Sequence, residues 1–531
     1  MALLKRTIDN GPRQIKEHAT MEQQIHSRRD FLKTTGYLAA TLALGGCLKR
    51  SLGSAANETT SGSTKPNIVF ILADDLGYGD PGCYNDESKI PTPALNRLAR
   101  EGIRFTDAHT PSAVCTPTRY GILTGRYCWR SSLKSGVLGG YSKPLVEKDR
   151  LTVASLLQRH GYTTGCVGKW HLGLGWVTKA SGDKPTAKTV DWTKTTAHGP
   201  QSLGFDYSYI IPASLDMDPY CYLENGHVVE APTNRTPGSK RRWDNGGGFW
   251  RAGPVAPSFD FTGVLPTITE KAVDFVKRQD GKQPFFLYVP LTAPHTPWMP
   301  TDEFRGKTDV DWYGDFVAQV DHSVGQIIEA LDAAGLRDET LLMVTSDNGS
   351  HWPVHQIEKF GHRANDGWRG QKADIHDAGH RVPLLCRWPG HIEPGTRSDQ
   401  TVCLTDLMAT CAAVVGDTLP AEAGPDSYNV LPAMLDPGLK KPIRAATVHH
   451  SLSGMFALRQ GPWKLIQGRG SGGFTAPRKI EPKPGEPQGQ LYNLDDDPSE
   501  QHNLWGERPD VVARLTALLE RYKKQGYSKP I

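Results

Sequence analysis

The feature that most constrains the fold is a set of continuous apolar runs of strand length that alternate with helical patterns from Lys65 onward. Residues 67–73, 285–289 and 341–345 are such runs. Runs of this kind are typical of strands covered on both faces, and their alternation with helices favours a parallel arrangement. We therefore predict an α/β fold with a large, mainly parallel sheet sandwiched by helices.

Helical patterns and a change of character after residue 400 predict two domains. Apolar residues at helical spacing predict helices over residues 92–102 and 315–334, and a final amphipathic helix that stops before Gly526. Short strands are expected near residues 447–449, 456–459 and 463–466. We predict one large domain over residues 65–400 and a smaller C-terminal α+β subdomain, with a short antiparallel sheet, over residues 401–531.

Residues 174–260 are rich in Gly, Pro, Lys, Thr and Trp and show no sustained periodicity. We expect long excursions over the surface here, and loops of this length in a compact domain are more often functional than idle. Disorder in parts of the stretch is the alternative.

The N-terminal residues resemble an export signal. Arg28-Arg29 precedes a mildly apolar stretch, residues 37–44, that is too short to span a bilayer. This order resembles a twin-arginine export signal, and residues 44–47 resemble a lipobox that ends at Cys47, whose acylation would provide a lipid anchor. We predict a signal over residues 1–47, a flexible linker over residues 48–64, use of the export machinery, and a periplasmic or membrane-anchored bacterial lipoprotein. The alternative is an ordinary basic pair before a frayed helix.

Composition excludes one class of partner and most disulfides. The formal net charge is only +4 over 531 residues, and we find no basic footprint for nucleic acid. Among nine cysteines, Cys166 and Cys386 lie in strand-like runs, and Cys403 and Cys411 lie near a predicted helix. We predict that most cysteines are small buried apolar side chains, with Cys115 as the exception.

Two apolar strands end in pairs of oxygen-bearing side chains. Asp74-Asp75 follows the first strand, and Asp347-Asn348 follows a later one. Carboxylates at the end of a buried strand are costly unless they are solvated, paired or bound to a cation. Hard oxygens without a His/Cys cluster suit Ca²⁺ or Mg²⁺ better than Zn²⁺. A helix cap or a turn is the alternative for each pair taken alone.

One further motif favours the metal-site interpretation over a cap or a turn. It is Cys115-Thr116-Pro117-Thr118-Arg119, followed by Leu123-Thr124-Gly125. It resembles the Cys-x-Pro-x-Arg core of the type I sulfatases in the alkaline-phosphatase superfamily, and every defining position matches. The resemblance implies an alkaline-phosphatase-like fold, with residues 65–400 as the catalytic domain. It also implies that a formylglycine-generating or other sulfatase-maturing enzyme oxidises Cys115 to formylglycine, whose hydrated aldehyde attacks sulfur and later expels sulfate.

Other family landmarks follow in the family's order and cover nearly the whole chain from Lys65 to about Leu504. They are residues 68–79, Val167-Gly168-Lys169-Trp170-His171-Leu172-Gly173, Pro294-His295-Thr296-Pro297, Ser346-Asp347-Asn348-Gly349, Arg369-Gly370-Gln371-Lys372 and residues 491–504. Taken alone, each lysine in these motifs could be an ordinary surface residue, and each histidine an ordinary loop residue. Only the joint pattern indicates a catalytic site.

Residue by residue, the resemblance implies roles in sulfate ester hydrolysis. The implied calcium ligands are Asp74, Asp75, Asp347, Asn348 and the modified Cys115. Arg119 would hold the formylglycine hydroxyl, while Lys169 and Lys372 would bind sulfate oxygens. His295, helped by Lys372, would protonate the leaving alcohol oxygen, and His171 would be the base that restores the aldehyde.

The substrate is less constrained. After Lys372 the chain reads Ala373 to Pro383 as ADIHDAGHRVP, where the family commonly has Trp-Glu-Gly-Gly before Arg-Val-Pro, so specificity cannot be carried over from other members. Trp312, Trp352 and Trp368 are expected near the active-site loops, where they could pack against sugar rings. Polar contacts are expected from His362, Arg363 and Asn365. We predict a sulfated carbohydrate, or an aryl sulfate in an assay.

Two other functions remain open. A phosphonate monoester hydrolase or phosphodiesterase of the same superfamily can share the Cys-x-Pro-x-Arg motif. A surface binding protein with a catalytically dead sulfatase fold is a further alternative. Loss of Cys115, a site lysine or a metal ligand would favour it, and none is missing.

Overall fold

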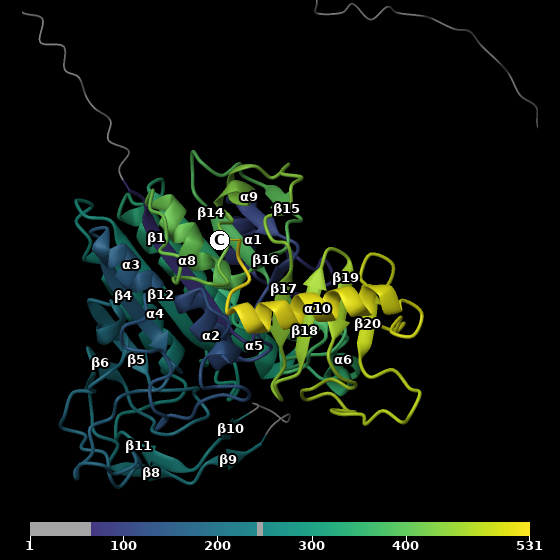
Figure 1. Ribbon diagram of the computed structural model, residues 1–531. Coiled ribbons are helices and arrows are strands. Elements are labelled where there is room, and N and C mark those ends of the chain that lie inside the picture. Colours follow the sequence, from purple (N-terminus) through teal and green to yellow (C-terminus); the bar gives the residue numbers. More distant parts are fainter. Residues whose placement is uncertain (1–64, 242–247, 531) are drawn as a thin grey trace, which may run out of the picture. The chain divides into compact units, whose positions relative to one another are not determined.

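The computed structural model describes residues 65–241 and 248–530 (Figure 1). The predicted export signal, the linker and Cys47 lie outside these residues. None of the helices in the described part is long and apolar enough to cross a membrane.

A ten-stranded sheet forms the centre of the described chain (Figure 1). Its strands, in spatial order, are β15 (Thr396–Ser398), β2 (Ile103–Phe105), β14 (Leu384–Arg387), β13 (Thr340–Ser346), β1 (Asn67–Asp74), β12 (Phe285–Pro294), β4 (Thr163–Lys169), β5 (Tyr207–Ile211), β6 (Leu223–Glu224) and β7 (His227–Val228). The five strands from β13 to β5 are parallel to one another, whereas β14, β6 and β7 run antiparallel to their neighbours. The prediction of a large, mainly parallel sheet is confirmed.

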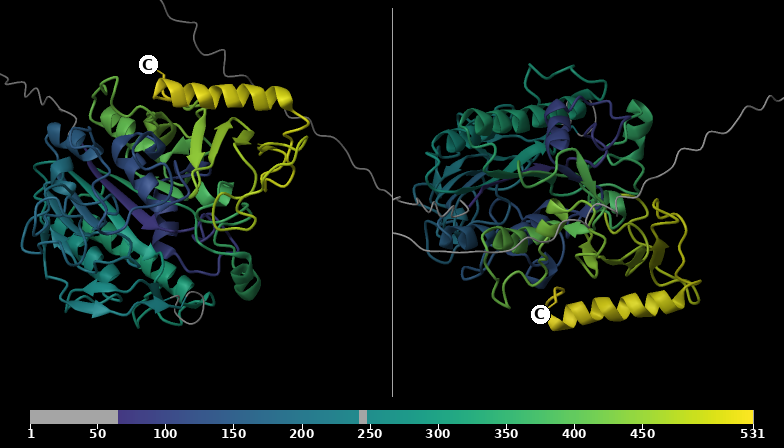
Figure 2. Two further views of the ribbon diagram at one scale, coloured as in Figure 1. Left: turned by 60° about the horizontal axis from the view of Figure 1, so that its bottom comes forward. Right: turned by 90° about the horizontal axis from the view of Figure 1, so that it is seen from above.

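Two groups of helices cover the sheet (Figure 2). One group is α1 (Pro93–Glu101), α4 (Val264–Lys277) and α5 (Asp311–Ala333). Helix α5 packs on the other two, α4 and α5 pack on β12, and α1 packs on β14. The other is α2 (Cys115–Thr124), α3 (Val153–Arg159) and α8 (Leu407–Val414), which also pack together. Two of the three predicted helices correspond to α1 and α5, and their apolar faces are buried because strands such as β12 are apolar on both sides.

A second, smaller sheet lies toward the C-terminus. It contains β17 (Thr447–His450), β18 (Phe456–Gln460), β19 (Trp463–Ile466) and β20 (Gln490–Asn493), all antiparallel, with α10 (Pro509–Gln525) packed against it. The three predicted strands and the final helix are present, and β20 is an additional strand. Because α8 packs on α2 and α3, residues just after 400 belong to the main core, and the separate layer begins near β17.

Short elements connect these layers. They are β3 (Ala108–His109), η1 (Cys128–Arg130), η2 (Pro200–Leu203), β8 (Asn234–Thr236), β9 (Ser239–Lys240), β10 (Phe249–Trp250), β11 (Gly253–Val255), α6 (Val354–Phe360), α7 (Asp377–His380), β16 (Val402–Cys403), η3 (Leu404–Asp406) and α9 (Leu431–Leu435). The predicted surface excursions are present in part: most of residues 177–198 and 224–241 are exposed or half-buried, whereas residues 203–223 are largely buried and include β5 of the central sheet. All eight cysteines in the described part are free, and seven of them are buried, as predicted.

Gly168 has a strict steric role in β4. Its φ is +139°, and a Cβ atom there would lie 1.9 Å from the carbonyl oxygen of Pro290 in the neighbouring strand β12. We therefore expect Gly168→Ala to lower the free energy of unfolding by about 3 kcal/mol, measured by urea denaturation, because backbone strain adds to overpacking. Gly161→Ala is the control, since its φ is also positive but its Cβ would meet open space. Equal losses in the two variants would contradict the steric explanation.

Candidate active site at the carboxyl edge of the central sheet

Two polar pairs meet where β1 and β13 end. Ala73 pairs with Ser346 in parallel register, so the residues that follow the two strands lie side by side. The backbone N–H of Asp75 donates to Asp347 Oδ1 (3.2 Å), and Asn348 Nδ2–H donates to Asp75 Oδ1 (2.7 Å). All four side chains of the two pairs are buried. The structure therefore brings together the residues that the sequence predicted as metal ligands.

Cys115 is the first residue of α2, and Arg119 lies one turn later. Arg119 is fully buried and donates from Nε and Nη2 to Asp347 Oδ2 (2.9 and 2.7 Å) and from Nη1 to the Lys169 carbonyl (2.8 Å). Burial raises the pKa of the Cys115 thiol, while the charge of Lys169 opposes that shift. Cys115 thus lies at a helix start within the electrostatic reach of the carboxylates and lysines.

Two buried lysines neutralise the first carboxylate pair. Lys169 Nζ donates to Asp74 Oδ2 (2.5 Å), and Lys372 Nζ lies 2.6 Å from Asp75 Oδ1. Burial by itself would raise the pKa of Asp74, but the charges of Lys169, His295, Arg119 and Lys372 together outweigh burial and lower the pKa. Both lysine ammonium groups therefore face the oxygen cluster, where they could also bind an anionic substrate group.

Two histidines border the same cluster. His295 Nε2 is 3.8 Å from Asp75 Oδ2, and the His295 ring lies 3.4 Å from the Ser214 hydroxyl. His171 is fully buried, one of its ring nitrogens contacts the Leu138 carbonyl (2.7 Å), and Nδ1 has no partner. Burial lowers the pKa of both imidazoles, helped by Lys372 at His295 and by Lys169 at His171, so both are neutral at pH 7.

The oxygen cluster fits a hard cation. Asp74 Oδ1 and Asn348 Oδ1 are buried without a hydrogen-bond partner. Burial, followed by the charge of Asp74, raises the pKa of Asp347 to about 7. A cation would satisfy the orphan oxygens and stabilise the ionised form of Asp347. Asp74, Asp75 and His295 also offer ligand atoms within 4.8 Å of one another, although oxygen-rich surroundings suit calcium better than a nitrogen-preferring metal.

A cavity of about 140 Å³ opens onto this cluster. Its lining residues are Asp75, Asp216, Phe249, Arg251, His295, Thr296, His351, Lys372 and Phe474. The sequence did not point to Asp216, Phe249, Arg251 or Phe474, because they lie in loops or in a two-residue strand, without a motif. A larger cavity of about 500 Å³ between α1 and α5 contains none of the clustered site residues.

The side chains predicted to make polar contacts with the sugar do not line the cavity. His362 is fully buried and bonds through Nε2 to Asp80 Oδ1 (2.9 Å), because its ring faces the interior. Arg363 is exposed, but it does not line the cavity. Asn365 is buried and bonds to the backbone of Ser350.

The predicted aromatic contacts also have other partners. Trp352 is buried and stacks on Tyr313, with ring centroids 4.5 Å apart. Trp312 lies under the guanidinium of Arg305, and Trp368 lies under Arg381. The aromatic side chains that line the cavity are instead Phe249 and Phe474.

Comparison with known proteins decides the family. The sequence profile of the sulfatases matches residues 66–417, more than half of the chain, including the clustered residues from Asp74 to Lys372. The chain belongs to the sulfatase family. A sulfatase is a sulfuric ester hydrolase, and the large mixed sheet with its small antiparallel sheet matches the alkaline-phosphatase-like fold of this family.

Relatives resemble this sulfatase over most of their length. The N-acetylgalactosamine-6-O-sulfatase of Bacteroides thetaiotaomicron is 35% identical over 498 residues, covering 87% of this chain and 94% of its own. Human arylsulfatase A is 32% identical over 481 residues, and the match covers 85% of this chain and 87% of the human protein. A solved Bacteroides thetaiotaomicron structure, associated with metabolism of multiple glycosaminoglycans, has a TM-score of 0.75 at 33% identity and covers 87% of this chain and 100% of its own.

Proposed function

We propose that this sulfatase hydrolyses sulfate esters of saccharides, with a formylglycine made from Cys115 and a bound calcium ion. The observation that carries the proposal is that Cys115 lies within electrostatic reach of two buried lysines and an incompletely satisfied oxygen cluster, from which Asp75 and Lys372 line a cavity. Relatives named for N-acetylgalactosamine 6-O-sulfate and for glycosaminoglycan metabolism support a saccharide substrate. Peptide mass spectrometry around Cys115, together with activity on a panel of sulfated saccharides, tests both parts.

Asp74, Asp75, Asp347, Asn348 and residue 115 would hold the calcium ion. When bound, calcium supplies positive charge that lowers the pKa of a hydroxyl group and neutralises the buried carboxylates. When oxidised, residue 115 would supply a hydrated aldehyde, whose two hydroxyl groups would provide a nucleophile for sulfur and a route for the release of sulfate.

The other residues position charge and protons. Arg119 is held by two hydrogen bonds to Asp347, so its guanidinium is fixed beside the first turn of α2. Lys169 and Lys372 can turn from the carboxylates to non-bridging sulfate oxygens once another cation balances those carboxylates. Fixed cations of this kind stabilise charge on the transferred group at little reorganisation cost.

The two histidines move protons. A sulfate placed beside His295 favours its protonated form, because an anion counteracts the burial that lowers its pKa. His295, helped by Lys372, then gives a proton to the leaving alcohol oxygen. His171, whose Nδ1 is unpartnered next to α2, is the base that restores the aldehyde.

The cavity provides contacts for the sugar. Phe249 and Phe474 offer apolar faces, while Arg251 and Asp216 form an ion pair at the same opening. The Arg251 side chain is about half exposed, so it can donate to sugar hydroxyls or to a second anionic group.

Arg251→Ala should separate sugar recognition from chemistry. We expect KM for a sulfated saccharide to rise by about tenfold with little change in kcat, since one rim hydrogen bond to a charged group contributes about 1.5 kcal/mol. A small aryl sulfate, which does not reach Arg251, should show an unchanged KM. Arg241→Ala, an exposed arginine that does not line the cavity, is the control. A fall in kcat with both substrates would contradict this role.

The main alternative is hydrolysis of a phosphonate monoester or phosphodiester. Steady-state comparison of sulfate and phosphate esters discriminates, and a clear preference for the phosphate diester would reject the sulfatase assignment. A catalytically dead binding protein is less well supported, because each residue of the catalytic pattern is present.

We propose that the chain is exported and reaches the periplasm or the outer surface of a membrane as a lipoprotein. The support is the order of Arg28-Arg29, the short apolar stretch and Cys47 in the sequence. N-terminal sequencing of the precursor and mass analysis of the mature chain test it, and a mature N-terminus upstream of Arg28 would contradict it. Sulfatase-maturing enzyme and export machinery are the expected partners.

A further inference from the structure

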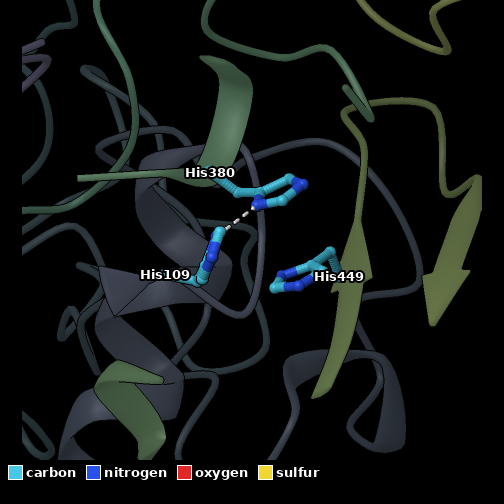
Figure 3. A group of neighbouring side chains, drawn as sticks. All are labelled: His109, His380 and His449. Carbon is cyan, nitrogen blue, oxygen red and sulfur yellow. Dashed lines mark hydrogen bonds between the residues drawn. The ribbon is translucent and has the colours of Figure 1, made fainter. Parts of the chain in front are cut away.

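Three buried histidines outside the proposed catalytic site lie together near the segment that leads to Cys115 (Figure 3). His109 ends β3, His380 ends α7, and His449 lies in β17. One ring nitrogen of each lies within 4.8 Å of those of the other two, and all three side chains are fully buried. The cluster therefore joins the main core, the loop after Lys372 and the small C-terminal sheet.

Two of the three rings have a hydrogen-bond acceptor on their outer side. His109 Nε2 lies 2.9 Å from Asp107 Oδ1, and His449 Nδ1 lies 3.0 Å from the Thr110 carbonyl oxygen. The third ring differs, because His380 Nε2 lies 3.1 Å from the Lys464 ammonium, a donor, and Asp377 Oδ1 is farther away at 3.7 Å. Histidines that bind metal ions usually donate their second N–H to a carboxylate or carbonyl in this way, which orients the ring and leaves the other nitrogen as a ligand.

The inner nitrogens are close to the spacing that a metal needs. His109 Nδ1 and His380 Nδ1 are 3.0 Å apart, and His449 Nε2 is buried with no hydrogen-bond partner. Nitrogens bound to one tetrahedral zinc ion lie about 3.3 Å apart. The His449 ring now stacks on that of His380, with centroids 3.8 Å apart. Because the three nitrogens already lie within 4.8 Å of one another, a turn of the His449 side chain out of the stack needs to move its nitrogen by no more than about 1.5 Å to reach that spacing.

The charges around the cluster permit a cation. Burial lowers the pKa of all three histidines, so they are neutral imidazoles, which is the form that binds metals. The surrounding charges are Asp107, Asp377, Glu500, Arg381, Arg459 and Lys464. For its Nδ1 to bind a metal, neutral His380 must carry its proton on Nε2. The Asp377 carboxylate can then accept a hydrogen bond from this N–H, and the Lys464 ammonium, which lies 3.1 Å from Nε2, must turn toward its other partners, Asp377 and Glu500.

We propose that His109, His380 and His449 bind a transition-metal ion, zinc or a chemically similar dication, at a site separate from the calcium site. Neutral nitrogen ligands favour such a metal over calcium. Bound there, the ion fixes β3, α7 and β17 to one another. The site supports the segments that carry Cys115 and Lys372, and it does not depend on which ester the enzyme hydrolyses.

The test uses the full chain, expressed with added zinc or cobalt and purified in calcium-containing buffer without a metal-affinity step. We expect about one zinc ion per chain by elemental mass spectrometry. The cobalt protein should show the strong visible absorption of tetrahedral Co²⁺, whereas Co²⁺ at the oxygen-rich site would absorb only weakly. A wild-type chain that retains no zinc and no tetrahedral cobalt overturns the proposal, whatever the variants do.

Substitution locates the ion. His449→Gln and His109→Asn should each lower retained zinc at least about tenfold. His450→Gln is the matched control, because His450 neighbours His449 in β17 and is also buried, but lies outside the cluster. Circular dichroism checks that the variants fold. Full zinc content in folded His449→Gln and His109→Asn chains would overturn the site, and an equal loss in His450→Gln would do so as well.

Discussion

Replacement of Cys115 by alanine is expected to lower kcat for a sulfate ester by at least about 10⁴-fold, because removal of a covalent nucleophile leaves only binding and electrostatic stabilisation. The fold should survive, because Cys115 is the buried first residue of α2 and alanine is tolerated at a helix start as well as cysteine is. Steady-state kinetics on the matured enzyme, with mass spectrometry of residue 115 in the wild type, measures the effect.

Cys411→Ala is the control for this change. Cys411 is also a buried, free cysteine in a helix, α8, but it lies outside the catalytic cluster. We expect its kcat to stay within about twofold of the wild type, with a modest loss of stability from the small cavity. Retained turnover in matured, calcium-loaded Cys115→Ala protein would exclude residue 115 as the nucleophile and with it most of the assigned roles.

Removal of calcium is expected to lower kcat by at least about 10³-fold, and restoring calcium should recover the activity. Without the ion, Lys169 and Lys372 stay in short ion pairs with Asp74 and Asp75 and are not available to sulfate. Burial then favours protonated Asp347, whose pKa is raised to about 7. Activity after treatment with a calcium-selective chelator, and after calcium is restored, measures the effect.

Asp347→Asn is the comparison variant, because it removes one predicted calcium ligand and its activity should no longer depend on calcium. It should have low activity that neither chelator nor added calcium changes, and isothermal titration should show weaker calcium binding than in the wild type. If the chelated wild-type enzyme kept its turnover, or if zinc but not calcium restored it, the carboxylate cluster would not be a calcium site.

Patterns local in the sequence predicted much of the fold and the polar cluster. The apolar run before Asp74 predicted β1, and the second run before Asp347 predicted β13. Parallel neighbours place their carboxyl ends at one edge, so the meeting of these two pairs follows from strand type alone. The resemblance added Lys169, Lys372, His171 and His295, which the fold brings to the same place.

The cavity wall and the histidine cluster were not predictable in this way. Arg251 and Phe474 come from irregular segments more than two hundred residues apart, and no period or motif connects them. His362 and Trp352 looked like substrate contacts by position, but their rings face the interior.

The sequence by itself determined the strands, the main helices and the chemistry-bearing pairs, because these depend on local apolar periodicity and on residues at strand ends. The tertiary structure alone decided which loops form the cavity and that His109, His380 and His449 share one buried space. Side-chain direction and contacts between distant segments depend on packing across the whole core, and a single sequence records no local signal for them.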